Sequence, residues 1–260
     1  MWDFTLEGRV FDIHGRKLQI EEQLTEVLDR NLGQRQVLAR VKNMDSKVQS
    51  LLKIRYQLNP KDFDFEDPGE VQEFAEEHYC YEVQAIKLLA ERGLGPKYFA
   101  HETQDQEEWM PFPGGYVDFI AMQLPPGEDV DEIQDELTNR QLDSIRTQLA
   151  YILEMMRKNG YKLVQQHPSY LNYDAQTNKL YLMDLAALDF TDPKTSFAID
   201  EESPYVEAFN IWRAPYSKPA KGPTSGGMPP DSTREKDPKP GRMPPSDQFT
   251  KKENKPPWRG

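Results

Sequence analysis

The residue of this 260-residue chain best placed to do chemistry is a carboxylate at the end of an apolar run. Residues 179–183 (KLYLM) are β-prone and stop abruptly at Asp184. A shorter strand is expected at 170–173, and the polar residues 174–178 (DAQTN) supply the turn between the two. A carboxylate that ends a buried strand reaches a cleft rather than solvent, and its oxygens suit Mg²⁺. The pattern therefore places the Asp184 carboxylate in a cleft.

The segment before this strand pair resembles a known family. Residues 160–169 (GYKLVQQHPS) are similar to the catalytic-loop pattern of the protein-kinase-like and aminoglycoside-phosphotransferase-like superfamily, in which His167 and the following proline match the His-Pro pair. Asp184, followed by Leu and Ala, stands where that family has its metal-binding Asp-Phe-Gly. The resemblance implies ATP and Mg²⁺ as cofactors and places His167 and Asp184 at catalytic positions.

Two catalytic positions depart from the family pattern. The base Asp falls on Gln165 and the second metal ligand, Asn, falls on Tyr170. Because an amide cannot accept the proton of an attacking hydroxyl near neutral pH, phosphate transfer should be crippled. An alternative alignment slides the loop by two residues, with Asn172 at the metal position and His167 at the base position, and would preserve some chemistry. Without any resemblance, the segment is a β-hairpin with a chance His-Pro and a terminal Asp.

Two upstream residues extend the resemblance. Lys53, in a strand expected over 50–56, stands at the position of the lysine that contacts nucleotide phosphates. Glu82, on a helix expected over 71–92, stands at the position of the glutamate that pairs with this lysine. The resemblance therefore implies a Lys53–Glu82 ion pair beside a bound nucleotide. The plainer alternatives are an ordinary outward-pointing strand lysine and a solvated helical glutamate.

The remaining parts of a nucleotide site are less distinct. Only Gly33 lies where the family has its glycine-rich loop, so tight cradling of phosphates by backbone N–H groups is not expected. Residues 115–124 predict a strand that resembles the one leading to the hinge between the lobes. Main-chain groups near Gln123 and Leu124 would face an adenine there.

The elements that position these residues follow from periodicity and turn chemistry. Apolar residues recur at helical spacing between Ile20 and Leu32, which predicts an amphipathic helix over 20–32 that stops at Gly33. The other expected elements are a hairpin or two short strands in 1–18, antiparallel strands at 36–41 and 50–56, the helix over 71–92 with a break near Tyr79, a strand from 97, a core helix over 129–160 and a short helix over 205–212.

Composition limits the class of protein. The chain is 37% hydrophobic and 29% charged, enough for one or two real cores, and no apolar run or basic start suggests a membrane span or signal peptide. A single cysteine, Cys80, excludes an intramolecular disulfide. Residues 214–260 carry ten Lys/Arg and five Asp/Glu, so the remaining chain has a net charge of −17 and should repel nucleic acid. We therefore expect a cytoplasmic or nuclear protein with neither nucleic-acid nor membrane partners.

The last 47 residues differ from the rest. Eleven of the 21 prolines fall in 214–260 among Ser, Thr, Lys and Asp, and such a segment buries too little apolar surface to offset its ordering entropy. We expect 214–260 to be a disordered Pro-rich tail. The sequence MPP occurs twice in it, at 228–230 and 243–245, either as a polyproline-type ligand motif or, more simply, as part of a flexible tail.

Taken together, these features predict an α+β, bilobed, protein-kinase-like fold with a truncated C-terminal lobe. The expected parts are an N-terminal extension (1–32) packing on the small lobe, an N-terminal lobe (33–124), a C-terminal lobe (125–213) and the tail. The resemblance implies a small degenerate member of the superfamily, of fungal type. The expected function is a catalytically impaired, pseudokinase-like module that binds a protein partner and binds nucleotide weakly. The alternatives are an ATP-dependent phosphotransferase with a rearranged site, or a kinase fold recruited to other chemistry in its cleft.

Overall fold

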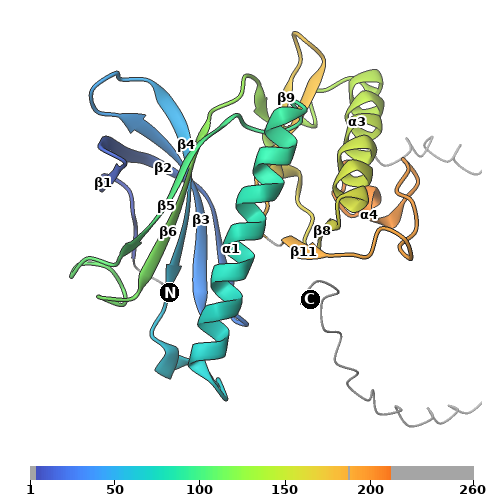
Figure 1. Cartoon of the computed structure of the whole chain (residues 1–260). Helices are drawn as coiled ribbons and strands as arrows, with labels where there is room; N and C mark the ends of the chain where they lie inside the picture. The colour runs from blue at the N-terminus through green and yellow to red at the C-terminus, as the bar shows by residue number, and fades with distance from the viewer. Residues whose placement is uncertain (1–3, 187, 212–260) are drawn as a thin grey trace, which may run out of the picture. The chain divides into compact units, whose positions relative to one another are not determined.

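The computed structural model describes residues 4–186 and 188–211 (Figure 1). The expected tail, 214–260, and Trp212 lie outside the described residues. The described chain is a mixed structure of helices and sheets. A six-stranded antiparallel sheet has the order β1-β2-β3-β4-β6-β5 and consists of β1 (Val10–Ile13), β2 (Arg16–Asp29), β3 (Gln34–Asn43), β4 (Gln49–Gln57), β5 (Tyr98–Asp105) and β6 (Tyr116–Gln123).

The second half of the described chain is built from shorter pieces around one long helix. Two small sheets have the orders β10-β9-β7 and β11-β8. The elements in chain order are β7 (Glu128–Asp129), α2 (Val130–Ile133), α3 (Asn139–Lys158), β8 (Tyr161–Leu163), the 3-10 helix η2 (Pro168–Tyr170), β9 (Leu171–Asp174), β10 (Lys179–Leu182), β11 (Leu188–Phe190) and α4 (Pro204–Glu207). The expected strand pair before Asp184 is confirmed as β9 and β10.

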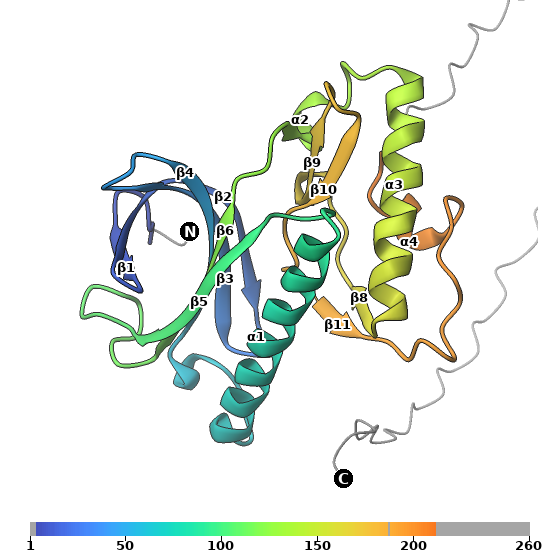
Figure 2. The same cartoon turned by 45° about the horizontal axis from the view of Figure 1, so that its top comes forward.

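The six-stranded sheet curls until its two edges meet (Figure 2). The Gln104 side chain of β5 donates to the Asp12 carbonyl of β1 at 2.7 Å, and the His14 backbone N–H donates to the Glu102 carboxylate at 2.9 Å. The expected N-terminal hairpin is confirmed, because His14 and Gly15 form the turn between β1 and β2 with φ of 49° and 76°. A core of apolar side chains fills the inside of the curl.

Successive side chains of β4 point alternately into the curled sheet and toward α1. Leu52, Ile54 and Tyr56 belong to the core inside the curled sheet. Because successive strand side chains point to opposite faces, Lys53 and Arg55 project from the outer face, where α1 (Pro68–Glu91) covers it. The two cations of β4 are thus held under a helix rather than in solvent.

The helix α1 is continuous. Asp67 caps its first turn by accepting from the backbone N–H groups of Gly69 and Glu70, after the 3-10 helix η1 (Pro60–Asp62). The expected break near Tyr79 is wrong, because the Tyr79 hydroxyl donates to the Phe119 carbonyl of β6 at 2.9 Å and the residue packs as part of a regular helix. In Figures 1 and 2, α1 lies between the six-stranded sheet and the part of the chain that contains α3.

The helix expected over 20–32 is wrong, since these residues lie mostly in β2. The register between β2 and β3 shifts twice, between Ile20 and Glu22 and between Gln23 and Thr25. Each bulge inserts an extra residue and changes which face the following side chains occupy. As a result, Leu24 packs against the core on the α1 side while Leu28 packs against the core inside the curl. A twice-bulged strand therefore imitates helical spacing.

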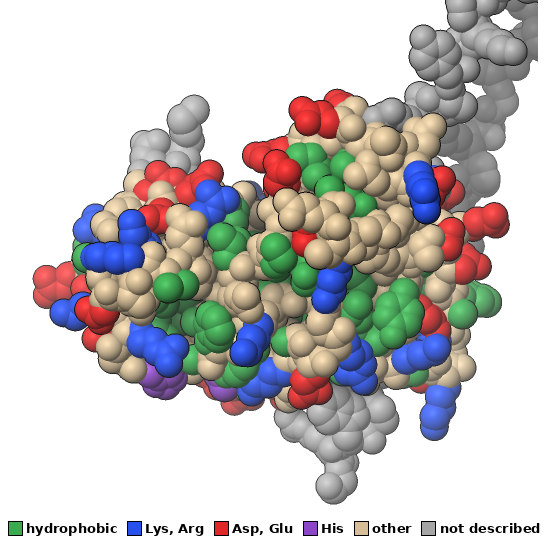
Figure 3. Space-filling model, turned by 90° about the horizontal axis from the view of Figure 1, so that it is seen from above, with side chains coloured by type: hydrophobic (Ala, Val, Ile, Leu, Met, Phe, Trp, Pro, Cys, Tyr) green, Lys and Arg blue, Asp and Glu red, His purple; other side chains and the backbone are tan. Residues whose placement is uncertain are grey.

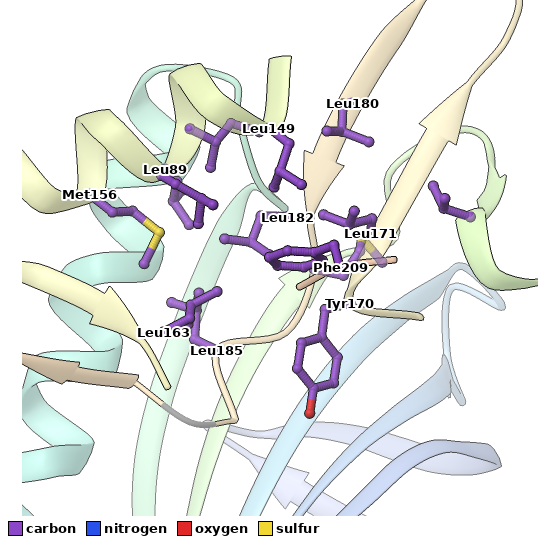
Figure 4. Close-up of a cluster of buried hydrophobic side chains, with 14 of the residues drawn as sticks. Leu89, Leu149, Met156, Leu163, Tyr170, Leu171, Leu180, Leu182, Leu185 and Phe209 are labelled. Atoms are coloured by element: carbon purple, nitrogen blue, oxygen red, sulfur yellow. The ribbon is translucent and has the colours of Figure 1, made fainter. Parts of the chain in front are cut away.

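The helix expected over 129–160 is two helices. A capping box between Thr138 and Gln141 starts α3, so the residues before Thr138 form the short α2 and a connecting turn. The helix expected over 205–212 is only the four residues of α4. Behind it, Phe209 sits at the centre of an apolar cluster formed by α1, α3, β9 and β10 (Figure 4). The strand pairs at 36–41 and 50–56, and the strands from 97 and over 115–124, are confirmed.

The surface carries both signs of charge. On the face shown in Figure 3, Asp, Glu, Lys and Arg side chains are interspersed, with apolar side chains between them. No helix in the described ranges is long and apolar enough to cross a membrane.

Candidate functional site

Three of the residues singled out by sequence meet in one buried cluster. Lys53 of β4, Glu82 of α1 and Asp184 at the end of β10 are between 1% and 3% exposed. The Lys53 ammonium lies 2.5 Å from the Asp184 carboxylate and 3.7 Å from that of Glu82. With Arg55, which lies 3.3 Å from Glu82, the cluster contains two cations and two anions. Its formal charge is therefore zero.

Both oxygens of Asp184 have protein partners. Lys53 donates to Oδ1, and the Thr25 hydroxyl of β2 donates to Oδ2 at 2.7 Å. Each oxygen keeps a second lone pair, so a metal ion at Asp184 would share this carboxylate with the Lys53 and Thr25 hydrogen bonds and compete with them. No group of three or more His, Cys, Asp or Glu side chains within 4–186 and 188–211 could hold a metal ion. A Mg²⁺ ion here would therefore have Asp184 as its protein carboxylate and would take its other ligands from phosphate oxygens and water.

Arg55 anchors α1 to the sheet. Its guanidinium donates to Glu82 at 3.3 Å and to the Ala75 carbonyl at 3.4 Å, and it lies 5.8 Å from the centre of the Tyr79 ring. These contacts span two turns of α1, so one β4 side chain runs along the inner face of the helix. Burial raises the pKa of the Glu82 carboxyl, and the neighbouring Lys53 and Arg55 oppose that rise.

The loop that contains Gln165 and His167 lies beside β2. Gln165 and His167 are exposed and, together with Thr25 and Tyr170, line an open groove of about 500 Å³. The His167 ring pairs with the Ser169 hydroxyl at 2.7 Å. Tyr170 is 7% exposed, and Figure 4 shows its ring extending from the apolar cluster with the hydroxyl toward the strands. Burial and the nearby Asp184 carboxylate raise the pKa of Tyr170, so a neutral phenol stands where a metal-binding amide was expected.

Asn172, the metal ligand of the alternative alignment, is engaged elsewhere. Its side-chain amide donates to the Pro126 carbonyl at 2.8 Å, and its backbone pairs with both β10 and β7. Asn172 therefore ties β9 to the segment after β6.

Gln123 and Leu124, the residues expected at a hinge, lie apart from the charged cluster. Gln123 is exposed and its backbone N–H donates to the Lys97 carbonyl at 2.8 Å, while Leu124 packs against the core on the α1 side. Neither residue lines the groove beside His167 or a second cavity, of about 510 Å³, beside Arg55 and Glu82. The main-chain donor of Gln123 is thus already used within the protein.

Gly33 has a structural role in the turn between β2 and β3. Its φ is 57°, and a Cβ at this position would lie 2.8 Å from the Phe65 ring. Glycine is required here by backbone conformation and by the close approach of that ring. The turn occupies the place of the family's glycine-rich loop, with a single glycine that packs against protein.

A buried carboxyl on β6 makes stability depend on pH. Burial raises the pKa of Asp118 to about 6 from a usual value of 3.8, although Thr103 donates to it at 2.7 Å and Arg55 lies opposite it. Because the folded state favours the protonated form, this contribution to stability is present at about pH 4 and is lost as the pH rises through about 6. We expect Asp118→Asn to raise the free energy of unfolding at pH 7.5 by about 1–3 kcal/mol.

Urea unfolding of Asp118→Asn and wild type at pH 4.5, 6 and 7.5 measures this effect. The exposed Asp105→Asn on β5 is the matched control and should change stability by less than about 0.5 kcal/mol. A difference between Asp118→Asn and wild type that does not grow with pH would contradict the prediction.

Sequence reasoning missed two members of the site. Arg55 follows Lys53 by two residues on a strand, so alternation alone places both on one face, and that signal was available. Thr25 had no comparable signal, because the residues around it were expected to form a helix.

Comparisons with known proteins give distant structural matches only. No protein-family profile and no curated protein matches the sequence. Two solved kinase structures are similar: the Cydia pomonella granulovirus kinase PK-1 (TM-score 0.43, 14% identity, 66% of this chain and 52% of that one) and vaccinia-related kinase 3 (TM-score 0.42, 17% identity, 72% and 53%). The chain spans about half the length of these two kinases.

Proposed function

We propose that the chain is a kinase-like module that does not transfer phosphate and acts by binding a partner protein. One observation carries the proposal: Asp184, the carboxylate that should hold a metal ion, is satisfied on both oxygens by Lys53 and Thr25. Gln165 and Tyr170, in place of a base and a second metal ligand, support it. A cluster neutralised from within needs neither metal nor nucleotide to stabilise it.

The order of the elements supports the kinase-like interpretation. The strand with Lys53 precedes the helix with Glu82, and the loop with His167 precedes the hairpin that ends at Asp184. In protein kinases a strand lysine pairs with a helix glutamate, and a catalytic loop precedes the metal-binding Asp. Three of the four landmarks meet within one network of ion pairs.

A thermal-shift titration tests whether the chain uses nucleotide and metal together. A ligand present at a hundredfold excess over its Kd stabilises the folded state by about 2.7 kcal/mol. We expect any stabilisation by ATP to be the same with and without Mg²⁺, because Mg²⁺ would compete with Lys53 and Thr25 for the oxygens of Asp184. Thr25→Val removes one of these contacts with little change in shape and serves as the comparison variant. A stabilisation of the wild type that requires both ATP and Mg²⁺ would contradict the proposal.

A gain-of-function experiment tests whether restoring the missing base and metal ligand creates ATP hydrolysis. We expect no ATP hydrolysis by the wild type, and slow hydrolysis when Gln165→Asp and Tyr170→Asn are combined with Thr25→Val. General-base assistance is worth typically about 10²–10⁴-fold, so restoring the base has a measurable effect once Asp184 is free. The Thr25→Val variant alone is the control. Wild-type turnover at about 1–100 s⁻¹, the ordinary kinase range, would overturn the proposal.

A second candidate, a phosphotransferase with a rearranged site, is favoured by the position of His167. This imidazole is exposed and lines the groove of about 500 Å³ with Gln165, where a substrate hydroxyl could reach it. In that case His167→Ala and Asp184→Ala would each abolish a turnover present in the wild type. His167→Ala has no effect on a module that only binds.

A further inference from the structure

A third cavity, of about 410 Å³, lies at one end of the curled six-stranded sheet (Figure 2). It is bounded by the turn between β1 and β2, the turn between β3 and β4 and the start of β5. None of its lining residues belongs to the charged cluster, to the groove beside His167 or to the cavity beside Arg55. It is therefore separate from the site described above, and its volume is that of small-molecule sites, about 300–1,000 Å³.

The inner face of the sheet changes from apolar to polar at this end. Leu18 of β2 and Leu52 of β4 belong to the core inside the curl. Because strand side chains alternate, Arg16 and Ser50, each two residues nearer the end, project from the same face. Asn43 of β3 is paired with Leu18 and points the same way. These three polar side chains all line the cavity.

The Ser50 hydroxyl is a buried polar group with no hydrogen-bond partner among the described residues. Ser50 is 8% exposed as a whole. Its oxygen is not one of the fully enclosed polar atoms of the described chain, so a molecule in the cavity can reach it. Since buried hydroxyls are usually paired, this one indicates a partner that residues 4–186 and 188–211 do not supply.

Two further donors at the cavity are unused within the described part of the chain. The Arg16 guanidinium has neither an ion pair nor a hydrogen bond there. The Asn43 side-chain oxygen accepts from two backbone N–H groups of the β3–β4 turn at 3.0 and 2.8 Å, which leaves its NH₂ group available. No Asp or Glu of the described ranges lines the cavity. The lining therefore offers one cation and no carboxylate.

The chemistry of this lining selects the ligand. A guanidinium, an amide NH₂ and a hydroxyl can all donate, and their common complement is a carboxylate, which also pairs with arginine through two parallel hydrogen bonds. Residues 1–213 have a net charge of −17, which favours a single negative charge over a polyanion. The other lining residues favour an apolar chain on the carboxylate, and they include Ile13, Leu18, Val48, Phe99, Ala100 and Ala121.

We propose that the cavity at this end of the curled sheet binds a small monocarboxylate with an apolar chain. The carboxylate accepts from Arg16, Asn43 and Ser50, and the chain lies against Phe99 and Ala121. Phe99 is 43% exposed, and such a ligand would cover it. This site uses no residue of the kinase-like module proposed above, so either proposal can fail without the other.

Octanoate is a suitable probe, and octylamine, which is protonated at neutral pH, is its counterpart of opposite charge with the same chain length. Titration of the ¹⁵N-labelled full chain with octanoate at pH 7, followed by NMR, should show saturable shifts at the backbone amides of Leu18, Ser50 and Ala121. Octylamine should bind at least about tenfold more weakly, because the cavity offers it no carboxylate. Equal binding of the two compounds, or no saturable shifts at these residues with octanoate, would overturn the proposal.

Three variants locate the binding. Arg16→Met removes an exposed cation of the lining, and Ser50→Ala removes the unpaired hydroxyl; each should weaken octanoate binding about tenfold. Lys17→Met is the matched control, because Lys17 is an exposed cation on the opposite face of β2 and does not line the cavity. It should change binding by less than about twofold, since salt screens exposed charges. Equal weakening by Lys17→Met and Arg16→Met, or full binding by Arg16→Met, would refute the site.

Discussion

Replacing Glu82 with leucine is expected to lower the free energy of unfolding by about 3–5 kcal/mol, because it removes one partner from a buried ion pair. Glu82 is 3% exposed and is the carboxylate that faces Arg55. Without it, Arg55 loses the carboxylate to which it donates, and Lys53 keeps Asp184 as its ion-pair partner. The resemblance implied a Lys53–Glu82 ion pair, and the burial of Glu82 raises the expected cost of removing one partner.

The control lies on the same helix. Glu73 is exposed on α1, so Glu73→Leu should change stability by less than about 0.5 kcal/mol in the same urea unfolding experiment. Combining Glu82→Leu with Arg55→Met removes one charge of each sign and should recover most of the loss, since apolar replacement of a whole buried pair is often neutral. A double-mutant cycle should give a larger coupling for Arg55–Glu82 than for Lys53–Glu82. Additive losses in the Arg55–Glu82 cycle would show that Arg55 does not hold α1 through this carboxylate.

The sequence predicted the parts of the site that local pattern controls. Lys53 and Asp184 lie in β-prone runs bounded by turn residues, and Glu82 lies on a helix of clear periodicity, so alternation and caps place them. Their meeting in one cluster was predicted only through the resemblance to a family. Pattern alone places each residue on an element and does not bring distant elements together.

The partner of Asp184 could not be predicted, because it depends on the path of β2. Two bulges change the faces of that strand and bring Thr25 to the carboxylate from 159 residues away in sequence. The bulges leave apolar residues at a spacing that imitates a helix, and the sequence therefore predicted a helix over 20–32. The single helix predicted over 129–160 is wrong for a related reason. Apolar residues keep a helical spacing through the turn between α2 and α3, and this turn ends at the Thr138 capping box.

The second large effect concerns the end of the described chain. Phe209 is fully buried, and Figure 4 shows it among Leu171, Leu182 and the side chains of α3. Phe209→Ala is expected to lower the free energy of unfolding by about 3–5 kcal/mol, because it leaves a cavity where a phenyl ring contacts three elements. Residues 206–211 therefore complete the core on the α3 side.

The matched control is another phenylalanine of the same segment. Phe197 is 93% exposed, so Phe197→Ala should change stability by less than about 0.5 kcal/mol in the same measurement. Equal effects of the two substitutions would show that residues 203–211 do not pack as described. A large loss for Phe209→Ala alone would mean that any shortened version of the chain must retain residues through 211 to keep α3 and the β9–β10 hairpin in place, and with them the position of Asp184.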